Sequence, residues 1–375
     1  MTRPVLPYTL EGWSPDGVEL LRQATQPSRG VRLSVVVPNF DTAAFVPDAI
    51  ASILAQTMPD LELVVVDDGS NDDSLQRILA CTDPRLTVVR QRNRGLAGAR
   101  NTGIVHSRAS TIGFCDSDDV WHPEKAARQL AVMDREPDVG LTFSHSMYLT
   151  QEGEPTGQLL LSRCAQPTVR DLIARNHVGN GSTPVVRRAC FARAGLFDED
   201  LAAGCEDFEM WVRIACLSGM TVRLVPEVLT GYRIRWSSGS MTFDRFLSGH
   251  HLAIERVRSY VPGFTERNAR RSNAEHLRIA SRKAFSAGRP DLSREYLLRA
   301  LRTYPSLVLR DVRALGMVAL HAASLPVPGA LRQRVYDAAI RGLTRAQSRF
   351  VAASKEPFAF PGAPSAAAHG GSARR

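Results

Sequence analysis

The chain has 375 residues, 44% of them hydrophobic and 23% charged, so it can form two or three domains with a buried core. This composition excludes a collagen, a coiled coil and a fully disordered chain, and no run is long and apolar enough to span a bilayer or serve as a signal peptide. The net charge of +9 originates in residues 250–350, which carry 19 basic and 7 acidic side chains, whereas residues 1–249 carry 25 and 30. The six cysteines lack C-x-x-C spacing and fit reduced thiols, so we expect a cytoplasmic protein.

In chain order, residues 1–30 are rich in proline and aperiodic, and we expect a loosely packed arm there. Four short β-branched runs then predict strands, at 33–37, 61–66, 85–90 and 111–115. Apolar residues at helical spacing predict helices between these strands, at 45–54, around 75–79 and at 96–108. Strands that alternate with helices indicate βαβ units and a buried parallel sheet, which we expect to extend over residues 31–243.

Polar clusters follow three of the predicted strands: PNFD at 38–41, DDGS at 67–70 and DSDD at 116–119. Any one of them has an ordinary explanation, because Asp, Asn, Gly and Ser are common turn residues. In a parallel sheet, however, the carboxyl ends of the strands open on one edge, where ligands bind. The three clusters together therefore predict a pocket at that edge.

Asp116, Asp118 and Asp119 place three carboxylates within four residues, which is unfavourable unless a cation offsets their charge. Hard oxygen ligands of this kind suit Mg2+ or Mn2+. The alternative is an acidic turn that caps the helix beginning near Pro123. Two further carboxylates at a strand end, Asp67 and Asp68, favour a site for a nucleotide and a metal ion.

The motifs SVVVPNFD, VVVDDGSNDDS, RNRGLAGARNTGI and FCDSDDVWHPEK resemble, in order and spacing, those of family 2 glycosyltransferases over roughly residues 33–241. The resemblance implies the GT-A fold, a Rossmann-like, mainly parallel sheet flanked by helices, and an inverting transferase that uses a nucleotide sugar. It also implies a nucleobase pocket lined by Pro38, Phe40 and Asp41, with Phe40 stacked on the base. Asp68 would accept a hydrogen bond from the base, and Asp67 would support that turn.

By the same resemblance, Asp116 and Asp118 form the DXD pair that contacts the ribose and the metal ion, Mn2+ or Mg2+. Asp119 remains an alternative to Asp118 as the direct metal ligand. Arg100 is a candidate contact for the diphosphate, although a surface position is the simpler expectation for it and for Arg94. A UDP-sugar is the donor that the resemblance favours, with thymidine and guanosine donors left open.

Gly204 to Phe208 resembles the family's ED motif, and Asp207 then matches the general base. A carboxylate in the first turn of a helix is favoured in its ionised form, which is the form that a base requires. The alternative is that Glu206 and Asp207 only cap the helix, and Glu206 is the second candidate for the base. The acceptor implied by the resemblance is a glycan or lipid-linked glycan of a cell-envelope or surface polysaccharide.

Residues 244–350 show only helical patterns, and 270–305 resemble one tetratricopeptide-type hairpin that turns at 288–290. We expect this basic region to be a helical bundle with a solvated arginine face; the alternative is peripheral contact with an anionic membrane, at the inner face of the cytoplasmic membrane, or with another protein. Basic and aromatic residues do not interleave there, so no nucleic-acid partner is expected. Residues 351–375 are rich in Pro, Gly, Ala and Ser and should be disordered.

Two other functions remain compatible with carboxylates at the strand ends. A metal-dependent phosphohydrolase or nucleotidyltransferase would release phosphate or pyrophosphate rather than a nucleoside diphosphate. A non-catalytic nucleotide-sugar-binding module would hold the donor without turnover, and an Asp207→Asn change would leave its behaviour unchanged.

Overall fold

Ten strands in the described part of the chain form one mixed sheet, in the order β1-β4-β3-β2-β5-β9-β7-β10-β6, with β8 paired to β7. The structure is a computed structural model that describes residues 8–26, 30–201, 204–235, 243–310, 312–324 and 338. The strands are β1 (Glu19–Arg22), β2 (Leu33–Asn39), β3 (Leu61–Asp67), β4 (Leu86–Arg90), β5 (Thr111–Phe114), β6 (Val120–Trp121), β7 (Val139–Leu149), β8 (Pro155–Leu160), β9 (Val185–Arg187) and β10 (Thr221–Arg233).

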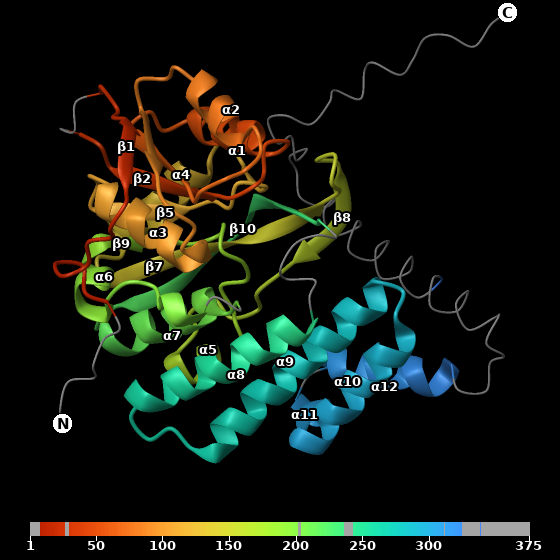
Figure 1. The fold of residues 1–375 in the computed structure, drawn as a ribbon. Coiled ribbons are helices and arrows are strands. Elements are labelled where there is room, and N and C mark those ends of the chain that lie inside the picture. Colours follow the sequence, from red (N-terminus) through yellow and green to blue (C-terminus); the bar gives the residue numbers. More distant parts are fainter. Residues whose placement is uncertain are drawn as a thin grey trace, which may run out of the picture.

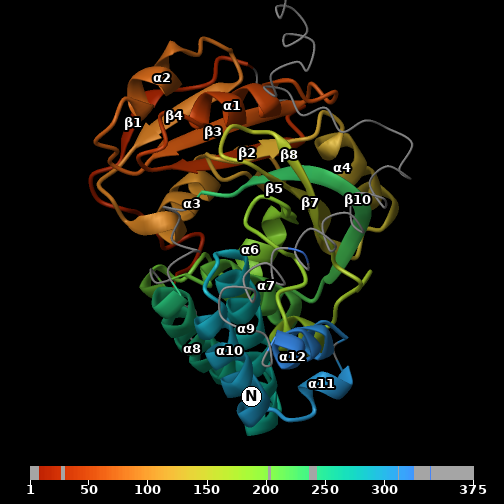
Figure 2. The same cartoon turned by 90° about the vertical axis from the view of Figure 1, so that its right-hand side faces the viewer.

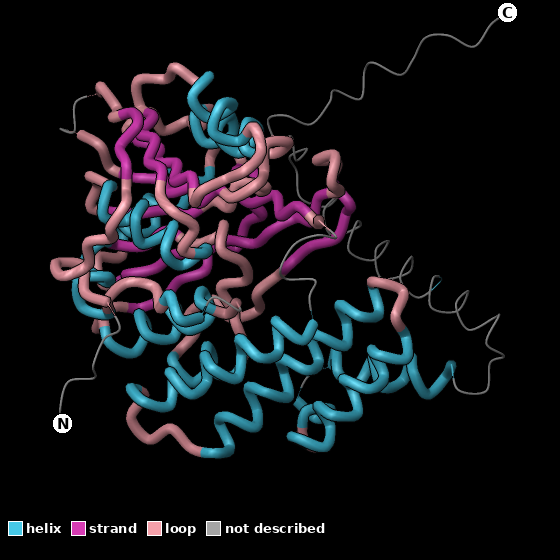
Figure 3. The backbone as a smooth tube through the Cα atoms, in the orientation of Figure 1, coloured by secondary structure: helices cyan, strands magenta, loops and turns pink. Residues whose placement is uncertain are grey.

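Helices flank this sheet and also form a separate layer beside it (Figures 1 and 3). The flanking helices are α1 (Val46–Leu54), α2 (Ser74–Ala80), α3 (Gly95–His106), α4 (Lys125–Arg135), α5 (Val169–Ala174), α6 (Arg188–Ala194), α7 (Glu206–Leu217) and the short 3-10 helix η1 (Glu199–Leu201). The separate layer contains α8 (Phe243–Tyr260), α9 (Glu266–Ser286), α10 (Pro290–Thr303), α11 (Leu307–Arg310) and α12 (Val312–Ser324).

The centre of the sheet is parallel, because β2 pairs in parallel with both β3 and β5, and β3 with β4. All seven residues of β2 are buried, as expected for a strand covered on both faces. Successive side chains point to opposite faces, so Val36 packs in the core formed with α3, α6 and α7, whereas Val35 and Val37 pack in the core formed with α1 and α4. The predicted parallel sheet flanked by helices is therefore confirmed.

The N-terminal arm is more ordered than expected. Residues 19–22 form β1, which pairs antiparallel with the edge strand β4, Leu20 lying opposite Val89. Trp13 is buried at 7% exposure in the core beside α3 and α7. The expectation of a loose, aperiodic arm was wrong for these residues, because a free sheet edge and an apolar core can order a short segment that has no periodicity of its own. Residues 1–7 and 27–29 lie outside the described residues.

The described residues between 243 and 324 form helices α8–α12, and α9 and α10 form the predicted hairpin. Figure 2 shows these helices gathered on one side of the sheet layer. Helix α8 contacts α7 and α9 contacts α5, and Ile254 of α8 is buried in the same core as Trp211 of α7. The helical layer therefore shares a hydrophobic core with the sheet layer. The expected disordered tail, 351–375, falls outside the described residues.

No helix in the described segments combines the length and the apolar character needed to cross a bilayer. All six cysteines are free thiols rather than disulfides.

Candidate functional site

The polar clusters that follow β2, β3 and β5 are joined by side-chain hydrogen bonds at one edge of the sheet. Asn39 donates from Nδ2 to Asp67 Oδ1 (3.2 Å) and to Ser70 Oγ (3.0 Å), which ties the first cluster to the second. Thr42 Oγ1 donates to Asn39 Oδ1 (2.6 Å) and lies 2.8 Å from Ser117 Oγ, which ties the first cluster to the third. The clusters meet because β2 lies between β3 and β5 and runs parallel to both.

The turn after β2 presents an aromatic ring to solvent. The predicted base-stacking residue Phe40 is 43% exposed, so a face of its ring is accessible to a planar ligand. Asp41 adopts a left-handed conformation (φ 48°), and its Oδ1 accepts hydrogen bonds from the backbone N–H groups of Asn71 (2.6 Å) and Asp72 (3.3 Å). Asp41 therefore holds the turn after β3 against the turn after β2. Pro38 is buried within β2, opposite Val66.

Asp67 and Asp68 have different surroundings at the end of β3. Asp67 is fully buried, and its Oδ2 lies 3.8 Å from Arg90 Nε. Asp68 Oδ1 accepts hydrogen bonds from Gln91 Nε2 (2.6 Å) and from the backbone N–H of Arg94 (2.9 Å). Burial raises the pKa of Asp68 to about 6, and these hydrogen bonds oppose the rise. A further hydrogen-bond donor that contacts Asp68 would therefore favour its ionised form.

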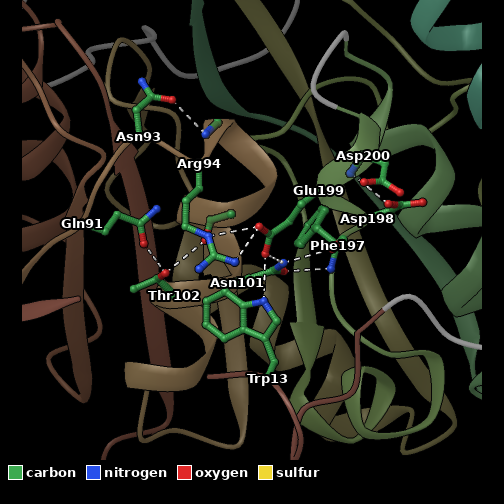
Figure 4. A network of polar contacts seen from close by, with 12 residues as sticks. Trp13, Gln91, Asn93, Arg94, Asn101, Thr102, Phe197, Asp198, Glu199 and Asp200 are labelled. Atoms are coloured by element: carbon green, nitrogen blue, oxygen red, sulfur yellow. Dashed lines mark hydrogen bonds and ion pairs between the residues drawn. The ribbon is translucent and has the colours of Figure 1, made fainter. Parts of the chain in front are cut away.

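A polar network joins the start of α3 to the arm and to η1 (Figure 4). Glu199 accepts hydrogen bonds from Trp13 Nε1 (2.8 Å), Asn101 Nδ2 (3.0 Å) and the guanidinium of Arg94 (2.8 Å). The Arg94 guanidinium also lies 5.1 Å from the centroid of the Trp13 ring, in cation–π geometry. Arg94 is half-buried, so its expected surface position was only partly right, and its side chain is committed to the network.

The three carboxylates of the DSDD cluster differ in how much of each remains accessible. The side chains of Asp116 and Asp118 are 23% and 14% exposed. Asp119 is fully buried, and both of its oxygens accept hydrogen bonds, Oδ2 from Ser182 Oγ (2.5 Å) and Oδ1 from the backbone N–H of Arg233 (2.9 Å). Burial, with the charges of Asp118 and Asp116, raises the pKa of Asp119 well above its usual range.

Two arginines at the end of β10 hold this cluster in place. Arg235 Nε donates to Asp118 Oδ2 (2.5 Å), and Arg233 Nε donates to the backbone carbonyl of Asp118 (2.9 Å). Burial raises the pKa of Asp118, although the charge of Arg235 opposes the rise. These arginines belong to the sequence RIRW at 233–236, whose last residue, Trp236, lies outside the described residues.

Arg100 bridges the DSDD cluster and the ED motif. Its Nη2 donates to Asp116 Oδ1 (2.8 Å) and its Nη1 donates to Glu206 Oε1 (2.7 Å). The surface position expected for Arg100 was wrong, because the residue is only 1% exposed. Burial alone would lower the pKa of Arg100, but the charges of Asp116 and Glu206 outweigh it and raise that pKa. A buried arginine is tolerated here because two carboxylates neutralise it.

Asp207 lies in the first turn of α7, as predicted, and is half-buried. Its Oδ1 accepts a hydrogen bond from the backbone N–H of Phe208 (2.6 Å), and its Oδ2 accepts one from Asn176 Nδ2 (3.3 Å). Burial and the neighbouring charge of Glu206 raise the pKa of Asp207 to about 7, against the lowering effect of Arg100. Asp207 therefore has the pKa that suits a general base working near neutral pH.

A cavity of about 20 Å³, with Asn176 in its lining, lies between β7, the end of β8 and the 175–179 loop. It is lined by Ser144, Ser146 and Ser162 as well as by that loop. This volume holds about one water molecule, so the cavity is too small for a sugar ring.

Cys205, His250 and His276 bring potential metal-binding atoms within 4.8 Å of one another, directly before the ED motif. The two imidazole rings are stacked, with centroids 3.7 Å apart and planes inclined by 9°. A metal ion lies close to the plane of each imidazole that binds it, so parallel rings at this separation cannot share one ion. We therefore interpret the group as a packed junction between α7, α8 and α9.

Several residues of the site were missed or left unassigned by sequence reasoning. Arg233 and Arg235 were not predicted as partners of the DSDD cluster. Gly181 and Ser182 were not predicted to support the acidic cluster: Ser182 donates a hydrogen bond to Asp119, and a Cβ atom at Gly181 would lie 2.2 Å from Arg100 Nη2. Asn176 carried no sequence signal, because its contact with Asp207 arises only from the fold.

Residues 34–193 match the family described as glycosyl transferase family 2. An uncharacterized glycosyltransferase of Rickettsia conorii is 28% identical over 223 residues, covering 59% of this chain and 35% of that protein. The UDP-Glc:alpha-D-GlcNAc-diphosphoundecaprenol beta-1,3-glucosyltransferase WfgD of Escherichia coli is 33% identical over 102 residues, 27% of this chain and 40% of that protein. The chain thus spans less than half the length of these two relatives.

Solved structures resemble the chain over most of its length. The structure of S. aureus TarS in complex with UDP-GlcNAc has a TM-score of 0.53 and 16% identity, covering 86% of this chain and 92% of that chain. A mannosyltransferase from Pyrobaculum calidifontis in complex with GDP-Man and Mn2+ has a TM-score of 0.51 and 20% identity, covering 87% and 88%. At these identities the likeness concerns the fold alone, and it confirms the expected GT-A arrangement.

Proposed function

We propose that the protein transfers a sugar from a nucleoside-diphosphate sugar to a hydroxyl group of a glycan or lipid-linked glycan, in keeping with the match of residues 34–193 to glycosyl transferase family 2. The observation that carries the proposal is the bridge made by Arg100. One buried guanidinium holds Asp116, at the strand ends, and Glu206, beside the candidate base. A nucleotide bound at the strand ends would therefore lie next to a carboxylate suited to activate an acceptor.

The donor would bind at the edge where β2, β3 and β5 end. The exposed ring of Phe40 would stack on the base, and Asp68 would accept a hydrogen bond from it. We propose a UDP-sugar as the donor. This agrees with the donor in the TarS complex, whereas the GDP-Man complex of the Pyrobaculum enzyme shows that the fold also accommodates guanosine donors.

Asp116 and Asp118 fit a divalent cation better than Asp119 does. Both are partly exposed, and in each an arginine occupies one carboxylate oxygen, whereas both oxygens of the buried Asp119 already accept hydrogen bonds. Carboxylate oxygens are the ligands that Mg2+ and Mn2+ prefer. We therefore favour Asp118 over Asp119 as a metal ligand. Bound there, the cation would supply positive charge against the leaving diphosphate.

Asp207 would act as the general base. Its carboxylate would take the proton from the acceptor hydroxyl as that oxygen forms a bond to the anomeric carbon, while the bond from this carbon to the diphosphate oxygen breaks. A single in-line displacement of this kind inverts the anomeric configuration. Glu206 is less suited to the role, because its carboxylate is committed to Arg100. The N-terminus of α7 favours the ionised form of Asp207.

We propose a role in the synthesis of a cell-envelope or surface polysaccharide, with a lipid-linked acceptor at the inner face of the cytoplasmic membrane. The name of the Escherichia coli relative specifies a diphosphoundecaprenol-linked acceptor, which supports this class of acceptor. A phosphohydrolase or nucleotidyltransferase is less favoured, because it gives no role to the carboxylate pair at the start of α7.

The proposal is tested by nucleoside-diphosphate release from UDP-, dTDP- and GDP-sugars, measured with Mn2+, with Mg2+ and with EDTA. We expect slow, metal-dependent release from one donor, and a loss of release of about 100-fold or more in Asp118→Ala. Asp134→Ala is the matched control, because the side chain of Asp134 is 60% exposed on α4 and pairs only with Arg32 among the described residues. Phosphate or pyrophosphate as the product, or no donor binding by calorimetry, would overturn the proposal.

A further inference from the structure

The loop after α5 holds the side-chain amide of Asn176 in a defined orientation. Asn176 Oδ1 accepts hydrogen bonds from the backbone N–H groups of Val178 (3.1 Å) and Gly179 (3.2 Å). Gly179 has a φ of 101°, a left-handed conformation that a residue with a side chain rarely adopts, so this tight loop depends on glycine at that position. The loop therefore places two backbone donors on one side of the amide.

These two donors determine which way the amide faces. If the amide were rotated by 180°, its NH2 group would meet two N–H donors and its carbonyl oxygen would meet a carboxylate, so both contacts would be repulsive. In the observed orientation Nδ2 donates to Asp207 Oδ2 over 3.3 Å. Asn176 is thus a fixed donor aimed at one oxygen of the candidate base.

The second oxygen of Asp207 is held independently. Its Oδ1 accepts the backbone N–H of Phe208 at 2.6 Å, so one donor on each oxygen defines the plane of the carboxylate. We propose that Asn176 is a positioning residue for the general base: it orients the Asp207 carboxylate toward the acceptor hydroxyl and favours its ionised form. This inference rests on the proposed function and adds to it a residue outside the motifs of the family.

The charged and titratable groups around Asp207 explain why such a donor matters. Glu206 and Asp116 disfavour its negative charge, and so does burial, whereas Arg100 from α3 favours it. Cys205, before α7, and Lys283, from α9, also interact electrostatically with Asp207. Asn176 is the side chain that donates a hydrogen bond to the Asp207 carboxylate among the described residues.

The decisive variant is Asn176→Asp, because it separates a role in the loop from a role toward the base. An aspartate keeps the oxygen that accepts the N–H groups of Val178 and Gly179, so the loop retains its turn. It replaces the donor with an oxygen facing Asp207, and two carboxylates at that distance cannot both ionise freely. Asn268→Asp is the matched control, because Asn268 also accepts a backbone N–H, that of Thr265 (3.0 Å), in an exposed cap far from the base.

We expect Asn176→Asp to lower kcat at pH 7 by about 10-fold or more and to leave the KM for the donor unchanged. The acidic limb of the plot of kcat against pH should move to higher pH by about one unit or more. Asn176→Ala should lower kcat with a smaller shift of the limb. Asn268→Asp should retain the wild-type profile. A wild-type profile in Asn176→Asp would mean that Asn176 only shapes its loop, and would overturn the inference.

A second readout needs no activity. Urea unfolding from pH 5 to pH 8 should show that the free energy of unfolding of Asn176→Asp falls below that of the wild type by an amount that grows with pH, because the paired carboxylates resist ionisation in the folded state. A difference that does not change with pH would overturn the inference. If the wild type releases no nucleoside diphosphate from any donor, the proposed function fails, and the unfolding series still decides whether Asn176 and Asp207 are coupled.

Discussion

At the scale of single residues, burial raises the pKa values of the carboxyl groups of the site to different extents. Burial raises the pKa of Asp68 to about 6 and that of Asp207 to about 7, so both change their charge near neutral pH. The pKa of Asp119 is raised well above its usual range, and its two oxygens accept hydrogen bonds from Ser182 and from the Arg233 backbone. Both oxygens of Asp119 are therefore already held by the protein, whereas a ligand could change the charge of Asp68 or Asp207.

Replacing Asp207 by Asn should abolish sugar transfer and change the pH dependence of stability. The folded-state pKa of about 7 lies above the unfolded value of about 3.9, so the wild type loses stability as pH rises from about 4 to about 7 and no more above that. Asp207→Asn has no such loss. We expect its free energy of unfolding, relative to the wild type, to rise by on the order of 1–3 kcal/mol between pH 4.5 and 8. Urea unfolding at several pH values measures this difference.

Asp41→Asn is the control, because Asp41 is an exposed carboxylate of the same edge whose Oδ1 already accepts two backbone N–H groups. The free energy of unfolding of Asp41→Asn, relative to the wild type, should not rise between about pH 4.5 and 8. If both substitutions changed the free energy of unfolding equally at every pH, burial would not raise the pKa of Asp207.

The acidic residues of the site could be predicted from the sequence, and Arg100 was named as a candidate, but the pairing of arginines with these carboxylates could not. The carboxylates follow predicted strands or begin a predicted helix, so their positions could be inferred from local pattern alone. Arg100 lies on α3, where an arginine is expected to face water, and its burial depends on Asp116 and on Glu206, which is 106 positions away in the chain. Contacts between such distant positions have no local signature, and the same holds for Asn176.

At the scale of elements, the four strands with continuous β-branched runs were predicted, and they form the parallel centre of the sheet. Strands β6 and β9 have only two and three residues, too few for a pattern to be recognised. The pairing of β10 with β7 is interrupted by register shifts around Pro226, which obscure its alternation. These later strands matter for the site, because β10 delivers Arg233 to the DSDD cluster.

The turn at 180–182, which precedes β9, limits the space available to the Arg100 guanidinium between Asp116 and Glu206. A Cβ atom at Gly181 would lie 2.2 Å from Arg100 Nη2 and 3.1 Å from Asp116 Oδ2. Gly181→Ala should therefore push the guanidinium away from Asp116 and Glu206, with a loss of about 1–3 kcal/mol in the free energy of unfolding and a fall in kcat. Chemical denaturation and nucleoside-diphosphate release measure the two effects.

Gly316→Ala provides the comparison, because Gly316 lies in α12 and an added Cβ atom would meet nothing within 4 Å. It should be neutral or stabilising by up to about 1 kcal/mol, since alanine favours a helix over glycine. Wild-type stability and activity in Gly181→Ala would mean that displacing the Arg100 guanidinium affects neither the fold nor the reaction.

At the scale of the whole molecule, helix α8 and the start of α9 share a core with the sheet layer, whereas the rest of α9 packs with α10–α12 in a second core. Ala253, Ile254 and Val257 of α8 are buried at 1% exposure or less in the core that contains Trp211 of α7, the helix that carries Asp207. Arg256 of the same helix pairs with Asp198 and Asp200 around η1 (2.8 Å each). The apolar side of α8 thus packs inward, while exposed leucines remain on the outer helices, Leu309 at 87% and Leu315 at 53%.

Shared burial of this kind predicts that the sheet and the helical layer unfold together. In a Trp236→Phe background the remaining tryptophans are Trp13, Trp121 and Trp211, whose fluorescence reports the sheet layer, whereas far-UV circular dichroism reports all the helices, α8–α12 included. Ile254→Ala should lower the free energy of unfolding by about 2–5 kcal/mol and move both transitions to lower urea by the same amount, because the cavity forms where the layers meet. Leu309→Ala, at an exposed site, should move neither by more than about 0.5 kcal/mol. A shift of the dichroism transition alone would mean that the helices fold independently, and that α8 does not support the helix that carries Asp207.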